Sequence, residues 1–327
     1  MRRAVVSGAF LAFASLVVTL GTFDVGLRYA DWAYRPTPRA IRGEFASRPS
    51  ENFVTDPDTG WRMRPGHAFR WNIDGHVNEY RANRQGFRSD LDFEHPDRPV
   101  TAFLGDSFTF GTGVDYVATY PHLVQELRPG TVAHSYAMPG FGVDQMWRSL
   151  SHQALPNKPT FVVVGFIDQD LDRSLTAFRQ GEGMAKPRFV LDAGTLRLEQ
   201  PRDAPGRLWR WLDGNSSLWT AIEVARQKYA RTHGGGEWFE LNAEIFAAMH
   251  EESRAKGIPV LFVRMPERGH IPFPALERFM AARHMNYLDL SVDAPDGLHF
   301  ATDAHINARG HAFVASRIAR TMAGLQH

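Results

Sequence analysis

Four short apolar runs constrain the fold of this 327-residue chain more than any other feature. They span residues 100–104, 131–133, 161–164 and 260–263, and polar residues do not alternate with apolar ones inside them. Strands that are buried on both faces of a parallel sheet have this pattern, whereas strands with one wet face alternate. The runs therefore predict a parallel sheet covered by helices on both sides.

Helical periodicity occurs between and after these runs. Apolar residues recur every three or four positions over residues 237–255, and Gly257 stands where a glycine commonly ends a helix. The same spacing over residues 314–322 predicts a last helix that ends near Gly324. Strands that alternate with helices over residues 98–325 predict one doubly wound α/β domain.

The N-terminus carries a different signal. Residues 4–23 form a run of 20 residues without a charge, preceded by Arg2 and Arg3. As a helix this run would be about 30 Å long, the thickness of the hydrocarbon core of a bilayer. We expect residues 1–27 to be a transmembrane anchor that leaves the rest of the chain outside the cytoplasm, in the periplasm. A cleaved signal peptide is the alternative, because residues 12–14 read Ala-Phe-Ala, a small-x-small cleavage pattern.

The remaining segments have distinct compositions. Residues 28–60, rich in Pro, Arg and Ser, are expected to be a linker, and residues 61–97 an extended lead-in packed on the core. Residues 174–236 interrupt the strand–helix alternation and are expected to be an inserted cap. Within the cap, residues 188–199 predict a β-hairpin that turns at residues 192–194. Three tryptophans of the cap pack it on the core, stack on sugar rings or contact the membrane, and these three alternatives stay open for Trp209, Trp211 and Trp219.

Composition excludes several classes of function. Lys and Arg total 37 against 36 for Asp and Glu, so the chain has no net positive field that would attract nucleic acid. The chain has no cysteine, which excludes disulfides, thiolate catalysis and iron–sulfur clusters. The 14 histidines show no metal-binding spacing. We therefore expect no cofactor and no metal, and chemistry built from Ser, His and carboxylates.

Candidate site residues follow the predicted strands. Active sites of such sheets form at the carboxyl ends of the strands, and Ser107 stands directly after the first run. A serine hydroxyl needs a base to become a nucleophile, and His305 near the end of the chain can supply it. Asp303 lies two positions earlier and would point the same way on an extended segment, where it could orient the imidazole.

An oxyanion formed in such a reaction also needs donors. The backbone N–H groups of Ser107 and Gly140 could supply two of them, and the side-chain amide of Gln169 a third. Asn307 is expected to cap the last helix and so to fix the corner that holds the base.

These blocks resemble the SGNH (GDSL) hydrolase family, in particular its membrane-anchored bacterial branch. The resemblance covers roughly residues 58–322. Residues 105–107 (Gly-Asp-Ser) match the first block, residues 135–145 the second and residues 303–311 the last. Two positions depart from the family pattern: Ser135 stands where the second block has Asn, and Gln169 where the third block has Asn.

The resemblance implies a flavodoxin-like parallel sheet and a triad of Ser107, His305 and Asp303, with Gly140 and Gln169 in the oxyanion hole. It implies a serine esterase that removes O-acyl groups, above all acetyl, from a carbohydrate or cell-surface polymer through an acyl-enzyme. Two alternatives stay open: an O-acetyltransferase that uses the same triad, and a non-catalytic anchored carbohydrate-binding or assembly protein.

Overall fold

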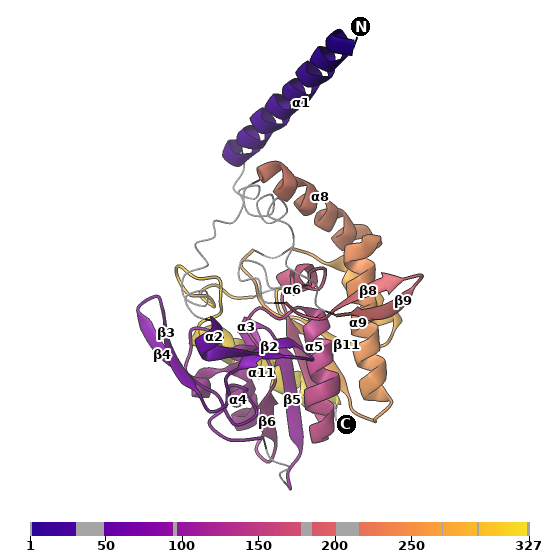
Figure 1. The fold of residues 1–327 in the computed structure, drawn as a ribbon. Coiled ribbons are helices and arrows are strands. Elements are labelled where there is room, and N and C mark those ends of the chain that lie inside the picture. Colours follow the sequence, from indigo (N-terminus) through magenta and orange to yellow (C-terminus); the bar gives the residue numbers. More distant parts are fainter. Residues whose placement is uncertain are drawn as a thin grey trace. The chain divides into compact units, whose positions relative to one another are not determined.

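The computed structural model describes residues 2–30, 49–93, 97–177, 185–200, 216–269, 271–292 and 294–325. Two compact units are present: Met1–Gly43 with Pro205–Ala230, and Glu44–Ala204 with Arg231–His327. The second unit contains the α/β domain, and Figure 1 shows its helices packed around a central sheet. Trp209 and Trp211 lie outside the described residues, as does the side chain of Trp219.

The central sheet has five parallel strands in the order β11-β10-β7-β5-β6. The strands are β5 (Val100–Gly105), β6 (Val132–Ser135), β7 (Phe161–Phe166), β10 (Val260–Arg264) and β11 (Asn286–Asp289). In chain order the arrangement is 2-1-3-4-5, the flavodoxin-like order. The four apolar runs thus become the four strands predicted from them. The fifth strand, β11, was not predicted from the sequence because its residues are only partly buried and include Asn286 and Asp289.

Helices cover both faces of the sheet, which explains why the strand residues do not alternate in polarity. On one face, Phe103, Val163 and Leu261 belong to a core cluster with residues of α4 (Tyr120–Leu127) and α11 (Ala308–Leu325). On the other face, Phe246 of α9 (Gly236–Arg254) contacts the rings of Phe166 and Phe262. Each central strand is therefore apolar on both sides.

Short elements, together with a hairpin in the insertion, make up the rest of the described part of this unit. After the short α2 (Pro49–Asn52), the chain forms two antiparallel hairpins, one of β1 (Phe53–Asp56) with β2 (Gly60–Met63) and one of β3 (Ala68–Ile73) with β4 (His76–Arg81). The other elements are α3 (Ser107–Phe110), η3 (Tyr116–Ala118), α5 (Val143–Ser149), η4 (Leu150–Ala154), η5 (Leu155–Asn157), α6 (Asp168–Arg173) and α10 (Pro274–Ala282).

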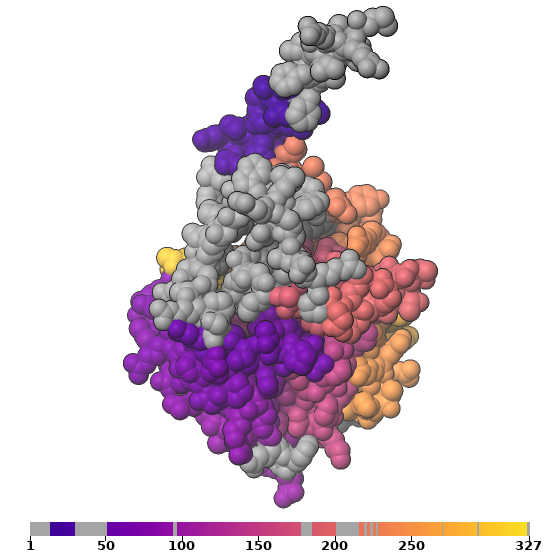
Figure 2. Space-filling view, viewed as in Figure 1, coloured from indigo at the N-terminus to yellow at the C-terminus, as the bar shows by residue number. Residues whose placement is uncertain are grey.

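The lead-in packs on the α/β domain through its aromatic side chains. The side chain of Trp61 is fully buried, donates from Nε1 to the carbonyl of Pro139 at 3.2 Å and meets the ring of Phe141 edge-on. In the face shown in Figure 2, the lead-in residues form a continuous surface with the segment that follows them. Helix α2 and the first strand of the β1–β2 hairpin, which starts at Phe53, lie inside the range expected to be a linker.

The hairpin predicted inside the insertion is present. Strands β8 (Arg188–Asp192) and β9 (Thr195–Glu199) pair directly, and the turn residues Ala193 and Gly194 both have positive φ. This is the backbone of a two-residue type I′ turn, whose twist matches that of the strands.

The first unit contains α1 (Arg2–Ala30) and most of α8 (Ser217–His233). Asp24 of α1 caps α8, because its Oδ1 accepts hydrogen bonds from Ser216 Oγ at 2.7 Å and from the Leu218 N–H at 2.8 Å. Side chains of α1 are described from residue 14 to residue 29, and several large apolar ones among them are exposed: Leu16, Val17, Val18, Leu20, Phe23 and Val25.

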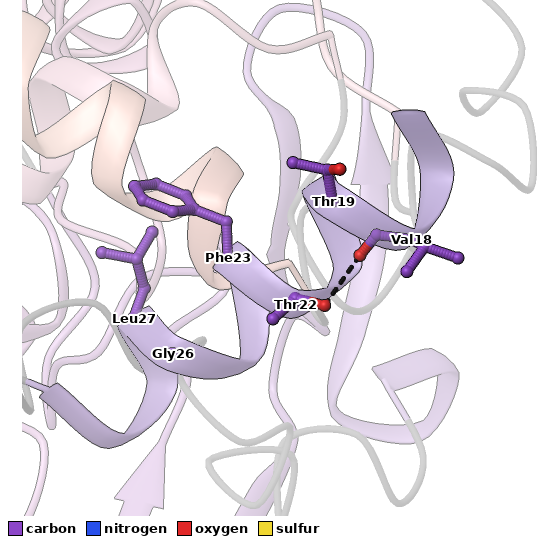
Figure 3. Close-up of a pocket in the computed structure, with 6 residues that line it drawn as sticks. All are labelled: Val18, Thr19, Thr22, Phe23, Gly26 and Leu27. Atoms are coloured by element: carbon purple, nitrogen blue, oxygen red, sulfur yellow. Dashed lines mark hydrogen bonds between the residues drawn. The ribbon is translucent and has the colours of Figure 1, made fainter. Parts of the chain in front are cut away.

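A groove of about 590 Å³ runs along α1 (Figure 3) and is lined by Val18, Thr19, Thr22, Phe23, Gly26 and Leu27. The hydroxyl of Thr22 donates to the Val18 carbonyl at 2.8 Å, so this polar group is satisfied within the helix.

Among the described residues, no helix meets the length and hydropathy expected of a membrane span. The anchor over residues 1–27 therefore stays a prediction.

Candidate functional site

The candidate nucleophile lies at the point where the strand order of the sheet reverses. Strands β6 and β7 flank β5 on either side, and Ser107 begins α3 immediately after β5. Asp106 caps this helix, because its Oδ1 accepts from the Phe108 N–H at 2.8 Å. The turn leaves no room for a side chain at Gly105, where a Cβ would collide with Thr109 Oγ1 and with the carbonyl of Gly165. A sharp strand-to-helix turn thus presents Ser107 at the carboxyl edge of the sheet.

The structure brings the three predicted triad residues together. His305 Nε2 lies 2.7 Å from Ser107 Oγ, and His305 Nδ1 lies 2.5 Å from Asp303 Oδ1. Ser107 Oγ also lies 3.3 Å from Asp106 Oδ2, but the contact with the imidazole is much shorter. The geometry therefore favours a hydroxyl proton directed at His305, which is the arrangement of nucleophile and general base.

The local conformation of the acid and base differs from the expected extended segment. Residues 301–305 form a series of bends, and Asp303 Oδ1 accepts from both the backbone N–H of His305 at 2.8 Å and its ring Nδ1. One carboxylate oxygen thus closes a tight Asx-type turn and orients the ring at the same time. Asn307 caps α11 as predicted, since its Oδ1 accepts from the Gly310 N–H at 3.1 Å.

Two residues that were not predicted from the sequence hold the loop of the acid and base in place. Arg268, four residues after β10, donates to the carbonyls of Phe300, Ala301 and Asp303. Asp74, at the tip of the β3–β4 hairpin, accepts from the N–H and the hydroxyl of Thr302. No local sequence pattern predicts either contact, because Arg268 lies 32 to 35 residues from its partners and Asp74 lies 228 residues from Thr302.

The predicted oxyanion donors occupy three separate segments. Gly140 has a φ of +80°, which a glycine adopts without strain. Neither its N–H nor that of Ser107 donates a hydrogen bond to another described residue. Gln169 is the second residue of α6, is exposed, and accepts a hydrogen bond on Oε1 from Arg173 Nη2 at 3.0 Å.

One arginine contacts the two buried carboxylates next to Ser107. Burial, together with the charge of Asp106, raises the pKa of Asp170 well above its ordinary value. Arg173 contacts both carboxylates. Burial lowers the pKa of Arg173, but the two carboxylates outweigh burial and the net pKa is raised. The pKa of Asp303 is lowered from its ordinary value. Burial alone would raise this pKa, but the hydrogen bonds from His305 and its charge outweigh the effect of burial.

A second buried ionic cluster lies at the same edge of the sheet. Asp168, the first residue of α6, accepts from Nε and Nη2 of Arg264 at 2.9 and 2.8 Å and also pairs with Arg231. Glu267 accepts from the Asp168 N–H at 2.9 Å. Burial and the neighbouring charge of Asp168 raise the pKa of Glu267 to about 7.

A serine, a histidine and an aspartate joined in this order by hydrogen bonds form the arrangement that serine hydrolases use, and this arrangement recurs on unrelated folds.

No protein-family model matches the chain, and a search of curated proteins finds no match. The chain is similar to several solved structures. An acetyl xylan esterase shares 14% identity at a TM-score of 0.41, with 68% of this chain and 98% of that chain covered.

Two further solved structures are similar to the same extent. A psychrotrophic esterase from Pseudoalteromonas sp. shares 11% identity at a TM-score of 0.40, with 69% of this chain and 98% of that chain covered. A GDSL-like lipase from Bacteroides thetaiotaomicron VPI-5482 has the same identity and TM-score, with 69% and 88% covered. Since the identities and TM-scores are this low, the function proposed below rests on the geometry of the site.

Proposed function

We propose that the protein is a serine esterase of the SGNH type that removes O-acyl groups, above all acetyl, from a carbohydrate or cell-surface polymer. The observation that carries the proposal is the continuous hydrogen-bonded series Ser107–His305–Asp303 at the carboxyl edge of the sheet. A pure binding module would not need a base 2.7 Å from a serine hydroxyl.

The proposed reaction proceeds in two halves. Ser107 Oγ attacks the ester carbonyl while His305 Nε2 takes the hydroxyl proton, and Asp303 stabilises the imidazolium that forms. The oxyanion accepts hydrogen bonds from the N–H groups of Ser107 and Gly140 and from the amide of Gln169. As the bond between the acyl carbon and the sugar oxygen breaks, the imidazolium gives its proton to that oxygen, so that the sugar leaves as a free hydroxyl and an acyl-enzyme remains. Water, activated by His305, then releases the acid and restores Ser107.

Fluorophosphonate labelling of the full-length protein in detergent tests the nucleophile. We expect stoichiometric labelling and hydrolysis of p-nitrophenyl acetate by the wild type, and loss of both in Ser107→Ala. Ser151→Ala is a matched control, because the Ser151 hydroxyl also contacts a carboxylate, that of Glu252 at 2.6 Å, but contacts no imidazole in the described part of the chain. Labelling that persists in Ser107→Ala would refute the assignment, and an unlabelled wild type would favour the binding module.

An O-acetylated oligosaccharide separates hydrolysis from transfer. A hydrolase releases acetate at a rate that does not depend on added unacetylated oligosaccharide. Acetate that instead appears on the added acceptor, detected by mass spectrometry, would identify an O-acetyltransferase with the same acyl-enzyme.

We also propose that residues 1–27 anchor the protein in the membrane with its α/β domain in the periplasm. The uncharged run over residues 4–23 and the exposed apolar side chains of α1 support the proposal, as does the internally satisfied hydroxyl of Thr22. A phosphatase fused after His327 should be active, and an inactive fusion would contradict this placement. N-terminal sequencing that finds the chain starting beyond residue 14 would instead identify a cleaved signal peptide.

A further inference from the structure

One guanidinium links the three segments that carry the proposed oxyanion donors. Nη1 of Arg173 lies 3.2 Å from Asp106 Oδ2 and 3.3 Å from the carbonyl of Phe141, and it also donates to Asp170 Oδ1. Nη2 donates to Gln169 Oε1 at 3.0 Å. The arginine ends α6, so it reaches these partners from the same short helix that carries Gln169.

These partners are next to the donors in the chain. Asp106 directly precedes Ser107, Phe141 directly follows Gly140, and Gln169 is the third donor itself. The contacts to Asp106 and Phe141 cross 67 and 32 residues of sequence, whereas the contact to Gln169 is one turn of helix. A single planar side chain therefore connects α6, which carries Gln169, to the two segments of Ser107 and Gly140, and the donors of all three must converge on one oxygen atom.

The contact to Gln169 also fixes which end of its amide is available. A guanidinium has only donors, so the amide atom that it contacts must be the oxygen. The Nε2 group is then free to donate, and it makes no hydrogen bond to another described residue. Gln carries one methylene more than Asn and has more rotamers to lose, and a hydrogen bond that holds its oxygen removes much of that freedom.

The positive charge has a second effect at the same place. Asp106 Oδ2 lies 3.3 Å from Ser107 Oγ, and an unbalanced carboxylate there would oppose the negative charge that develops on the attacked carbonyl. Arg173 contacts this same oxygen atom. An arginine remains charged at any pH at which the protein is folded, so the compensation does not depend on pH.

We propose that Arg173 is a positioning residue that assembles the oxyanion hole: it directs the Gln169 amide and holds the loops of Ser107 and Gly140. This inference rests on the proposed esterase function. It also explains how a glutamine serves at a position where the related blocks have an asparagine, because the arginine holds the longer side chain.

The test measures kcat and KM for p-nitrophenyl acetate with the full-length protein in detergent, for Gln169→Ala, Arg173→Lys and the double variant. Lysine keeps the charge but lacks the planar fork that reaches several acceptors at once. We expect kcat to fall about 100-fold in each single variant, as for loss of one oxyanion donor, while KM changes less than about threefold. The double variant should lose less than the product of the two single losses, because Arg173→Lys acts in part by releasing the same Gln169 donor.

Arg188→Lys is the matched control. Arg188 also makes a two-pronged contact, to Glu199 at 3.2 and 3.0 Å, and reaches one carbonyl, that of Leu175. It lies in the insertion hairpin, and its substitution should leave kcat unchanged. The rate of fluorophosphonate inactivation should fall in parallel with kcat in the Arg173 and Gln169 variants only, because phosphonylation builds charge on the equivalent oxygen.

Asp170→Asn combined with Arg173→Lys keeps the test decisive if Arg173→Lys alone does not fold. This variant removes the carboxylate that lysine would leave unpaired, and we expect the same loss of kcat in it. Wild-type kcat in either folded Arg173 variant would overturn the role of Arg173 alone, and losses that multiply in the double variant would overturn its action through the Gln169 amide. A wild type that neither hydrolyses the ester nor reacts with the probe would overturn the proposed function and this inference together.

Discussion

Replacing Asp303 by asparagine provides a quantitative test of the triad. In the folded protein one oxygen of Asp303 accepts from the backbone N–H of His305 at 2.8 Å and lies 2.5 Å from its Nδ1. Asparagine is nearly isosteric and keeps an oxygen for the backbone contact, so the turn should survive. What is lost is the negative charge that stabilises the imidazolium and selects its tautomer.

The expected loss can be bounded. A hydrogen bond to a charged partner contributes about 1.5–3 kcal/mol, which corresponds to roughly 10- to 150-fold in rate. The wrong tautomer adds to this, and in serine proteases the equivalent change costs about 10⁴-fold. Because the Asp303 side chain is 30% exposed, solvent screens part of its charge. We therefore expect kcat to fall between about 10² and 10⁴-fold.

The assay is p-nitrophenyl acetate hydrolysis over pH 5–9, with thermal unfolding measured in parallel. Asp289→Asn is a close structural control, since Asp289 Oδ1 accepts from the Ser291 N–H at 2.8 Å and from its hydroxyl at 2.5 Å. This is the same type of turn at the same sheet edge without a histidine, so kcat should be retained. A loss of less than tenfold in Asp303→Asn, with the fold intact, would refute the assignment of Asp303 as the orienting acid.

Three further predictions concern the surroundings of the site. Arg268→Ala should lower kcat about 10- to 100-fold by loosening the loop that carries the triad acid and base, whereas Arg278→Ala, which removes a contact to one carbonyl outside that loop, should not; steady-state kinetics checks both. Trp61→Phe should destabilise the fold by about 1–3 kcal/mol, measured by urea unfolding, because it leaves the Pro139 carbonyl without its indole donor. Burial raises the pKa of Glu267 to about 7 from 4.5, so its neutral form stabilises the fold below pH 4.5 and that contribution disappears as the pH rises through 7. Glu267→Gln should therefore unfold at a higher temperature than the wild type at pH 8, and a lower unfolding temperature there would contradict this sign.

Features that depend on neighbours in the chain were predictable. Burial on both faces removes polar residues from central strands, so the runs over residues 100–104 and 161–164 are recognisable from their composition alone. The hairpin turn needs two residues with positive φ, and Gly194 between two apolar segments supplies one of them without strain, whereas Ala193 adopts its positive φ at a cost. The β11 strand was not predicted, because an edge strand with half-buried residues lacks the apolar run from which a buried strand is recognised.

The candidate site could likewise be predicted from the sequence only in part. The sequence by itself determined which residues could act as nucleophile, base and acid, because those side chains occur at the ends of predicted strands. Only the tertiary structure brought Ser107 within 2.7 Å of a histidine 198 residues away. It also decided that Asp303 and His305 meet through a tight turn, and that Arg173, Arg268 and Asp74 support the site. Their partners are chosen by how the sheet and its loops pack together, and no local spacing in the chain encodes such contacts.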